Sequence, residues 1–334
     1  IGNPPYISAM DLKKRLGDAK YSNLKAGYKT AKGTIDIYIL FFEFGLRSLS
    51  DTGYLIYISP NRYLSASYGE ALREFIFEGY KIESISDFSS VRVFEAAATY
   101  PVVSLIGKQT KSSKDVLIRK FNAGFTVIND WVNNESDLKL LPKMNWGFLL
   151  NSKIDLVKKI ISESEPLADC GKINATSTAK EADNYHKLIN EKDGIKLVNT
   201  GTIDRYLSLW GREKLTDKGE TYLRPYLLKD ESVISKNRLK LYEKPKILLA
   251  KIGLRAEAFF DVNGEFASIN TNCIHSFSPE YKPEYITSWL NSKLYHFLFS
   301  CLFDGLRMAG GYLLYSAPNL KSTFIKKADE DIQK

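Results

Sequence analysis

Cysteine, histidine and methionine are scarce in this 334-residue chain, which contains three of each. The cysteines Cys170, Cys273 and Cys301 are odd in number and far apart, so their spacing matches neither a disulfide framework nor a zinc site. We therefore expect a reducing, cytoplasmic environment. The histidines at positions 186, 275 and 296 are equally dispersed, and we expect them to have structural or surface roles and to bind no metal.

Long apolar runs are also lacking. A membrane-spanning helix needs about 20 predominantly apolar residues. The apolar stretch from Ile35 to Leu46 is shorter and contains Asp36 and Glu43. No signal peptide is recognisable either, so we expect no membrane partner.

The overall composition is that of a globular protein large enough for two domains. Hydrophobic residues make up 44% of the chain and charged residues 26%, both ordinary values. The net charge of +8 is compatible with a nucleic-acid partner, although many proteins without one are as basic. Charge therefore permits a nucleic-acid function without defining it.

The segment Asn3-Pro4-Pro5-Tyr6 carries the strongest chemical signal. Consecutive prolines restrict two φ angles, remove two N–H donors and push each preceding residue toward an extended conformation. The Asn3 side-chain oxygen and the Pro4 main-chain oxygen then lie beside the aromatic ring of Tyr6. Two acceptors and a flat ring suit a planar base with an exocyclic amine. A polyproline ligand or an ordinary loop are the alternatives for these residues alone.

This segment resembles the catalytic motif of DNA amino-methyltransferases, which methylate N6 of adenine or N4 of cytosine with S-adenosylmethionine. The resemblance implies that Asn3 and Pro4 accept the hydrogens of the amine, which localises its lone pair toward the incoming methyl group. It also implies base flipping from double-stranded DNA, with Tyr6 stacking on the flipped base. Asn at the first position favours adenine over cytosine.

The pattern of the first part predicts an α/β fold. Residues 35–49 have helical periodicity, and residues 54–59 are a continuous apolar run typical of a strand buried on both faces of a parallel sheet. A helix over 66–77 and strands over 81–88 and 100–106 follow. The last two strands are too close in sequence for a crossover helix, so they are expected to pair antiparallel at the sheet edge. Residues 8–33 are polar, lysine-rich and interrupted by glycines, which favours a mobile loop, with a short helix as the alternative.

This order resembles the C-terminal half of a Rossmann-like methyltransferase sheet that ends in an antiparallel hairpin. The first half, with the Gly-rich loop that binds most of S-adenosylmethionine, is expected to lie outside this chain, either earlier in the same polypeptide or in a partner chain. By the resemblance, Phe41 contacts the cofactor adenine and Phe94 faces Tyr6 across the flipped base. Plain core packing is the alternative for both phenylalanines.

The catalytic part is expected to cover residues 1–125, and an α+β target-recognition domain residues 126–334. In the latter, the sequence predicts a strand over 246–250, a hairpin turn at Asn263-Gly264 and one helix over 285–303. This ordering resembles the TaqI-like C-terminal specificity domain of Type IIG and related adenine methyltransferases. Basic residues in predicted loops are the candidates for DNA contacts: Lys172, Arg205, Lys251 and Arg255.

The leading hypothesis is a DNA adenine-N6 methyltransferase fragment from a restriction–modification system, inactive by itself. One alternative is a DNA-binding specificity module without catalysis of its own. Another is an amino-methyltransferase acting on RNA or protein glutamine, because the same tetrapeptide suits those substrates. The sequence shows no convincing nuclease cluster, so DNA cleavage by this chain is not expected.

Overall fold

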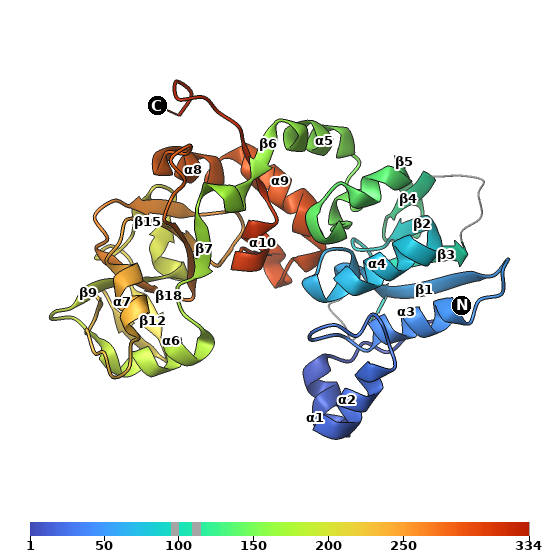
Figure 1. Ribbon diagram of the computed structural model, residues 1–334, viewed down its shortest axis with the longest axis horizontal. Helices are drawn as coiled ribbons and strands as arrows, with labels where there is room; N and C mark the ends of the chain where they lie inside the picture. The colour runs from blue at the N-terminus through green and yellow to red at the C-terminus, as the bar shows by residue number, and fades with distance from the viewer. Residues whose placement is uncertain (95–99, 109–114, 334) are drawn as a thin grey trace. The chain divides into compact units, whose positions relative to one another are not determined.

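The computed structural model describes residues 1–94, 100–108 and 115–333, and the chain forms two compact units (Figure 1). Unit 1 comprises Ile1–Ile154 with Cys301–Leu306, and unit 2 comprises Asp155–Ser300 with Arg307–Lys334. The functional boundary expected at residue 125 stays a prediction. Among the helices described, none has the length and apolar character needed to cross a membrane.

A five-stranded sheet in the order β1-β3-β2-β4-β5 forms the centre of unit 1. All neighbouring pairs are antiparallel except β2 and β4, which are parallel. Helix α3 packs against β1 and helix α4 against β2, which gives the mixed α/β architecture expected. The elements are α1 (Ala9–Leu16), α2 (Asp18–Ala26), α3 (Tyr38–Arg47), β1 (Tyr54–Pro60), α4 (Glu70–Gly79), β2 (Tyr80–Asp87), β3 (Pro101–Lys108), β4 (Asp115–Phe121) and β5 (Val127–Asn134).

Two expectations about this sheet are wrong. Strands β2 and β3 do pair antiparallel, but they do not form the edge, because β3 lies between β1 and β2 and the other side of β2 pairs with β4. Strand β1 is not buried on both faces of a parallel sheet. It pairs antiparallel with β3, its parallel contact is an isolated bridge between Gly2 and Tyr57, and Tyr54 is 58% exposed. Tyrosine combines an apolar ring with a polar hydroxyl and can remain partly exposed. An apolar run that contains tyrosines can therefore form a strand with one face toward solvent.

The expected loop over residues 8–33 contains helices α1 and α2. The Ser8 hydroxyl oxygen caps α1 by accepting the Asp11 N–H at 3.2 Å, and Gly17 separates the helices with a φ of 77°. The buried Glu43 carboxylate accepts the N–H groups of Lys29 and Thr30 at 3.0 and 2.8 Å. Lysine is a good helix former, so a polar segment folds here as solvated helices attached to α3.

A buried arginine organises the chain after β1. Arg73 on α4 is 1% exposed and donates to the carbonyl oxygens of Tyr63, Ala66 and Lys143 at 2.5, 3.0 and 2.9 Å. Burial lowers the pKa of Arg73 to about 10, which leaves the guanidinium charged at neutral pH. Its hydrogen bonds hold the short turns between β1 and α4 in place.

Unit 2 contains two four-stranded sheets, β18-β9-β14-β8 and β17-β15-β19-β7. The pair β18 and β9 is parallel, and the other pairs of these two sheets are antiparallel. The strands are β6 (Ser164–Pro166), β7 (Lys172–Ala175), β8 (Ile189–Asn190), β9 (Ile195–Asn199), β10 (Ile203–Asp204), β11 (Leu207–Ser208), β12 (Leu215–Asp217), β13 (Glu220–Tyr222), β14 (Tyr226–Leu227), β15 (Lys246–Ala250), β16 (Ile252–Gly253), β17 (Ala258–Asp261), β18 (Phe266–Ile269), β19 (Thr271–His275), β20 (Leu313–Leu314) and β21 (Phe324–Lys326).

The remaining helices are α5 (Ile154–Ser162), α6 (Ala179–Tyr185), α7 (Lys236–Tyr242), α8 (Pro283–Leu290), α9 (Lys293–Phe303) and α10 (Ala317–Lys321). The single helix expected over 285–303 is therefore two helices, α8 and α9. The break falls at Asn291, whose side chain bonds both the N–H and the carbonyl of Ala258, while the Ser292 hydroxyl oxygen caps α9 by accepting the Tyr295 N–H at 3.0 Å.

The hairpin expected at Asn263-Gly264 is also wrong. The strands on either side of this turn join different sheets, because β17 pairs with β15 whereas β18 pairs with β9. Gly264 is required there for two reasons: its φ is 68°, and an added Cβ would lie 2.5 Å from the Glu243 backbone. The Asn-Gly pair thus marks a turn between sheets.

Candidate active site and nucleic-acid interface

The Asn3–Tyr6 corner follows directly from a backbone bridge to β1. The Gly2 N–H donates to the Ile56 carbonyl at 2.9 Å, and the Ile58 N–H donates to the Gly2 carbonyl at 3.1 Å. A Cβ at Gly2 would lie 2.9 Å from the Tyr57 ring, so this close approach requires glycine. The bridge places the corner beside the end of β1.

Within the corner, Asn3 is exposed, Pro4 is buried and Tyr6 is half-buried. The Tyr6 hydroxyl lies 2.8 Å from Asn3 Oδ1 and 3.1 Å from the Ile58 carbonyl oxygen, and it donates toward both. Burial raises the pKa of the Tyr6 phenol to about 12, so the hydroxyl stays protonated at neutral pH and remains a donor. An amide oxygen has two lone pairs, so Asn3 Oδ1 is oriented by Tyr6 and can still accept a second hydrogen bond.

Phe94 lies next to Tyr6. Their ring centroids are 6.1 Å apart with an interplanar angle of 79°, and Tyr38 contacts Tyr6 from another side at 6.2 Å and 81°. The structure thus brings Phe94 and Tyr6 together in an edge-to-face contact. The role of Phe94 opposite Tyr6 across a flipped base stays a prediction.

A hydrogen-bonded group behind Tyr6 was missed by sequence reasoning. The hydroxyls of Tyr38 and Tyr68 lie 3.0 Å apart. Burial raises the pKa of the Asp36 carboxyl, against the opposing effects of the Tyr68 hydrogen bond and the Arg62 charge. No local spacing links Tyr68 to the corner, so the sequence carried no signal for this contact.

Phe41 lies on the outer side of α3 and is 37% exposed, so it is not a core residue. With side chains of α2, α3 and the segment between them it lines an apolar groove of about 360 Å³. The other lining residues are Leu24, Tyr28, Ile37, Leu40 and Phe44. The contact of Phe41 with a cofactor adenine stays a prediction, and an apolar groove with exposed aromatic rings has the right chemistry to hold a flat ring system.

The four basic residues predicted to contact DNA lie at different places in unit 2. Arg205 and Arg255 line one pocket of about 490 Å³. Lys251 directly follows β15, where its N–H donates to the Thr200 hydroxyl oxygen at 3.2 Å. Lys172 is exposed on β7. His275 on β19 pairs with Lys172 on one side and with Lys246, the first residue of β15, on the other. Lys172 is therefore level with the start of β15, whereas Lys251 follows its end. DNA contacts by each residue remain predictions.

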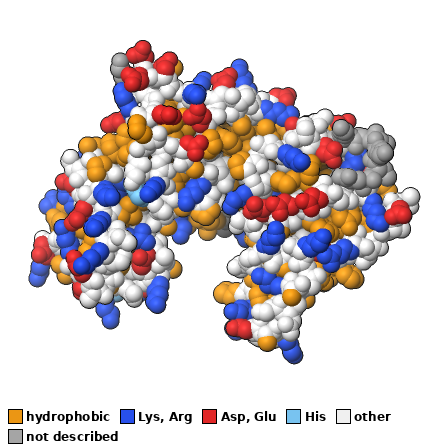
Figure 2. All heavy atoms as spheres, viewed as in Figure 1, with side chains coloured by type: hydrophobic (Ala, Val, Ile, Leu, Met, Phe, Trp, Pro, Cys, Tyr) orange, Lys and Arg blue, Asp and Glu red, His pale blue; other side chains and the backbone are white. Residues whose placement is uncertain are grey.

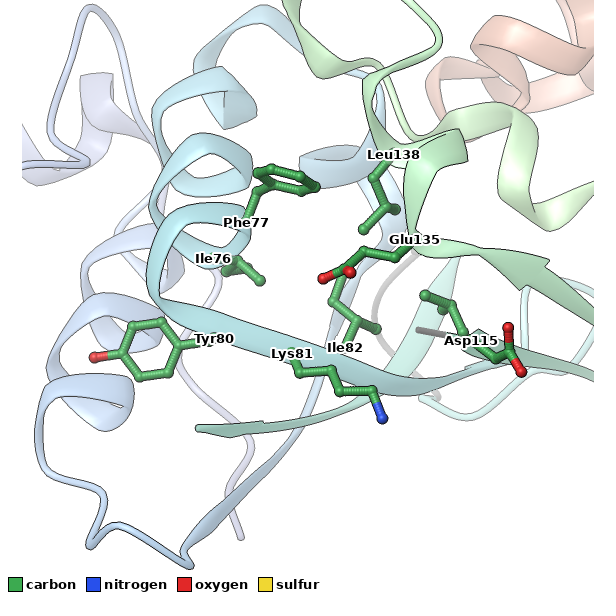
Figure 3. Close-up of a pocket in the computed structure, with 9 residues that line it drawn as sticks. Ile76, Phe77, Tyr80, Lys81, Ile82, Asp115, Glu135 and Leu138 are labelled. Atoms are coloured by element: carbon green, nitrogen blue, oxygen red, sulfur yellow. The ribbon is translucent and has the colours of Figure 1, made fainter. Parts of the chain in front are cut away.

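Other parts of the described chain offer less. A pocket between α4, β2 and the turn Glu135–Lys139 has a volume of about 10 Å³, which is room for about one water molecule (Figure 3). Among the described residues, no group of His, Cys, Asp and Glu side chains is placed to hold a metal ion. The three cysteines are free and buried, and burial raises the pKa of each thiol, which makes them poor nucleophiles.

Comparison with known families assigns both parts of the chain. Residues 1–94, which include Asn3, Tyr6, Phe41 and Phe94, match the Eco57I restriction-modification methylase family, and residues 180–309 match the TaqI-like C-terminal specificity domain. The first part of the chain is thus similar to the Eco57I methylase family and the second part to the TaqI-like specificity domain. The resemblance stated from the sequence is thus confirmed, and the specificity domain contains Arg205, Lys251 and Arg255 but not Lys172.

Curated relatives of this chain include Type II restriction enzymes and methyltransferases. The Escherichia coli Type II restriction enzyme and methyltransferase RM.Eco57I is 30% identical over 58% of this chain, and the Geobacillus stearothermophilus Type II methyltransferase M.BstVI is 31% identical over 36% of it. The matched region spans about a fifth of the length of each of these curated relatives.

Solved structures with low sequence identity align with most of the chain. The type IIG restriction endonuclease BpuSI covers 99% of this chain and 47% of its own, with 14% identity and a TM-score of 0.40. The Type IIL restriction-modification enzyme MmeI, solved in complex with DNA, covers 88% of this chain and 42% of its own, with 14% identity and a TM-score of 0.48.

Proposed function

We propose that this chain is part of a DNA methyltransferase of a restriction–modification system that transfers a methyl group from S-adenosylmethionine to N6 of a flipped adenine. One observation carries the proposal: the exposed Asn3 amide is oriented by the Tyr6 hydroxyl at 2.8 Å, beside the ring of Phe94. The match of residues 1–94 to a restriction-modification methylase family, and the similarity of the chain to Type II methyltransferases, support DNA as the substrate.

When bound, the cofactor would supply the methyl group on a sulfonium sulfur, and Phe41 in the apolar groove would contact its adenine ring. The Gly-rich loop that binds the rest of the cofactor is proposed to lie outside residues 1–334. The chain by itself is therefore proposed to bind duplex DNA without methylating it.

The residues of the corner act on the substrate amine. Asn3 Oδ1 and the Pro4 carbonyl oxygen accept its two N–H bonds, which favours a pyramidal nitrogen whose lone pair points at the methyl carbon. With the cofactor bound, the nitrogen would form a bond to that carbon as the carbon–sulfur bond breaks, and the methylated amine would then release a proton to solvent. Tyr6 and Phe94 hold the base in the position for in-line transfer.

The test is methyl transfer by the intact methyltransferase that contains this chain. Asn3→Ala is expected to lower turnover about 10²- to 10³-fold, the range seen when one preorganised hydrogen-bonding group is removed from an active site. Asn129→Ala, the same substitution at an exposed position of β5, is the matched control and should retain full turnover.

The identity of the product completes this test. Digestion of the methylated DNA and mass spectrometry of its nucleosides should yield N6-methyladenine. Exclusive N4-methylcytosine would refute the choice of adenine, and unchanged turnover in the Asn3→Ala enzyme would refute the role of the corner.

A further inference from the structure

A pocket of about 490 Å³ in unit 2 is assembled from three segments that are far apart in the sequence. Arg205 comes from the turn between β10 and β11, Arg255 and Glu257 from the segment before β17, and Lys293 and His296 from the first turns of α9. Only two of these residues, Arg205 and Arg255, were expected from the sequence to have a function.

Hydrogen bonds to a single residue hold the walls of the pocket together. Asn291 accepts the Ala258 N–H at 3.0 Å through its side-chain oxygen and donates to the Ala258 carbonyl at 2.8 Å. The Tyr206 N–H donates to the same carbonyl at 2.8 Å. The turn that carries Arg205 and the start of α9 are therefore both attached to β17.

The lining of the pocket carries an excess of positive charge. Arg205, Arg255 and Lys293 are cationic, and Glu257 is the one carboxylate among the residues that line the pocket. The positive end of the α9 dipole also lies at this wall, because Lys293 begins the helix. The pocket thus favours an anion.

Two buried polar atoms in the lining have no hydrogen-bond partner within the described part of the chain. They are Nε of Arg205 and Nδ1 of His296. Buried polar groups are nearly always paired, so these two atoms leave the wall of the pocket incompletely hydrogen-bonded within the described residues. A guanidinium offers only donors, so a ligand held by Arg205 has to be an acceptor.

We propose that this pocket binds a phosphodiester of the DNA backbone. Phosphate oxygens are pure acceptors with negative charge, which matches two arginines, a lysine and a helix N-terminus. The proposal rests on the proposed function in naming DNA as the source of the phosphate. It adds Lys293 and His296 to the interface and assigns Arg205 and Arg255 to backbone positioning, not to base recognition.

Two titratable groups in the pocket, His296 and Glu257, have shifted pKa values. Burial lowers the pKa of His296, and the charges of Arg307 and Arg255 lower it further, so the imidazole is neutral at pH 7. Burial and the Asp204 charge raise the pKa of Glu257, against the effect of Arg255 and Arg205. A phosphate bound beside His296 would favour its charged form and raise its pKa.

The first experiment measures duplex DNA binding by residues 1–334 at several salt concentrations. Arg255→Gln is expected to weaken binding about tenfold to every duplex sequence and to reduce the slope of log K against log salt by about one. Arg212→Gln is the matched control, since Arg212 is exposed in the same unit, loses the same charge and does not line the pocket. Equal effects of the two substitutions would overturn the proposal.

Glu257→Gln distinguishes a phosphate from a base edge. Removal of the carboxylate is expected to strengthen binding severalfold to all duplex sequences, because one negative charge leaves the pocket. If Glu257 instead accepts a hydrogen bond from a base amino group, the same substitution weakens binding to particular sequences only, and that result would overturn the phosphodiester assignment.

The final measurement separates this proposal from the methylation proposal. The His296 imidazole should shift in an NMR titration with a short duplex, and its pKa should rise, whereas a duplex with methylphosphonate linkages should have little effect. An equal response to both duplexes would overturn the proposal. The Asn3→Ala result decides methylation independently, because Asn3 lies in unit 1 and outside this pocket.

Discussion

The corner of unit 1 and the pocket of unit 2 present opposite hydrogen-bonding character. The corner offers oxygen atoms, with Asn3 Oδ1 oriented by Tyr6. The pocket offers donors, two arginines and a lysine, and one arginine nitrogen lacks a partner among the described residues. The corner suits an amine and the pocket suits a phosphate. A nucleic acid carries both groups, the amine on its bases and the phosphate in its backbone.

The two sites also differ in how they are built. Four consecutive residues make the corner, and two prolines restrict its backbone before any tertiary contact forms. The pocket depends on Asn291 and Tyr206, which both bond Ala258 from distant parts of the chain. Figure 2 shows positive and negative side chains mixed over the visible face.

After Asn3→Ala, the largest loss of methyl transfer is expected from removal of the Tyr6 ring. Tyr6→Ala removes the ring and its hydroxyl, and loss of base stacking worth about 1–3 kcal/mol should lower methyl transfer about 10- to 100-fold. The measurement is single-turnover methyl transfer by the intact enzyme. Wild-type rates in this variant would show that the corner does not hold the base.

Loss of the hydrogen bonds that hold the walls of the pocket should destabilise unit 2. Asn291→Ala leaves the Ala258 N–H without its partner, and the loss of buried hydrogen bonds should destabilise unit 2 by about 2 kcal/mol. Hydrogen exchange should show faster exchange of the Ala258 amide and unchanged protection of β2 and β3 in unit 1. Slow exchange at Ala258 in the variant would contradict the scaffold role.

A smaller effect is expected from Tyr6→Phe, which keeps the ring and removes only the hydroxyl. The hydrogen bond that orients Asn3 is worth about 1 kcal/mol, so turnover should fall by less than about tenfold. A loss as large as that of Tyr6→Ala would assign the main role to the hydroxyl and not to the ring.

The smallest effect concerns pH. The pKa of His296 is lower in the folded protein than in the unfolded chain, so the unfolded state binds more protons as the pH falls. Stability should therefore be complete above the ordinary histidine pKa of about 6.5 and decline below it. The pKa of His275 is also lowered, so both histidines contribute to this decline. The free energy of unfolding in urea should therefore be measured against pH in the wild type and in His296→Gln. The part of the decline that is absent in the variant is the contribution of His296. If stability depends on pH in the same way in the variant and the wild type, His296 makes no such contribution.

Several helices and strands could be predicted from the local sequence pattern, because one type of secondary structure buries their apolar residues best. The apolar run at Tyr54–Pro60 forms β1, and every residue of Lys246–Ala250 is buried in β15. The periodicity of residues 35–49 gives α3, and the two segments that are too close for a crossover pair antiparallel as β2 and β3. Hydrophobic burial acts on these segments wherever they are placed in the fold.

Tertiary contacts decided the rest. Strand β4 occupies the side of β2 that was expected to be an edge, and Asn291 divides one periodic helix in two because its amide bonds the backbone of β17. The same holds for function. Asn3, Pro4 and Tyr6 are recognisable from sequence because covalent constraint makes their chemistry local. Lys293 and His296 acquire a possible role only when folding brings them to Arg205 and Arg255, since charge and hydrogen bonding act through space and not along the chain.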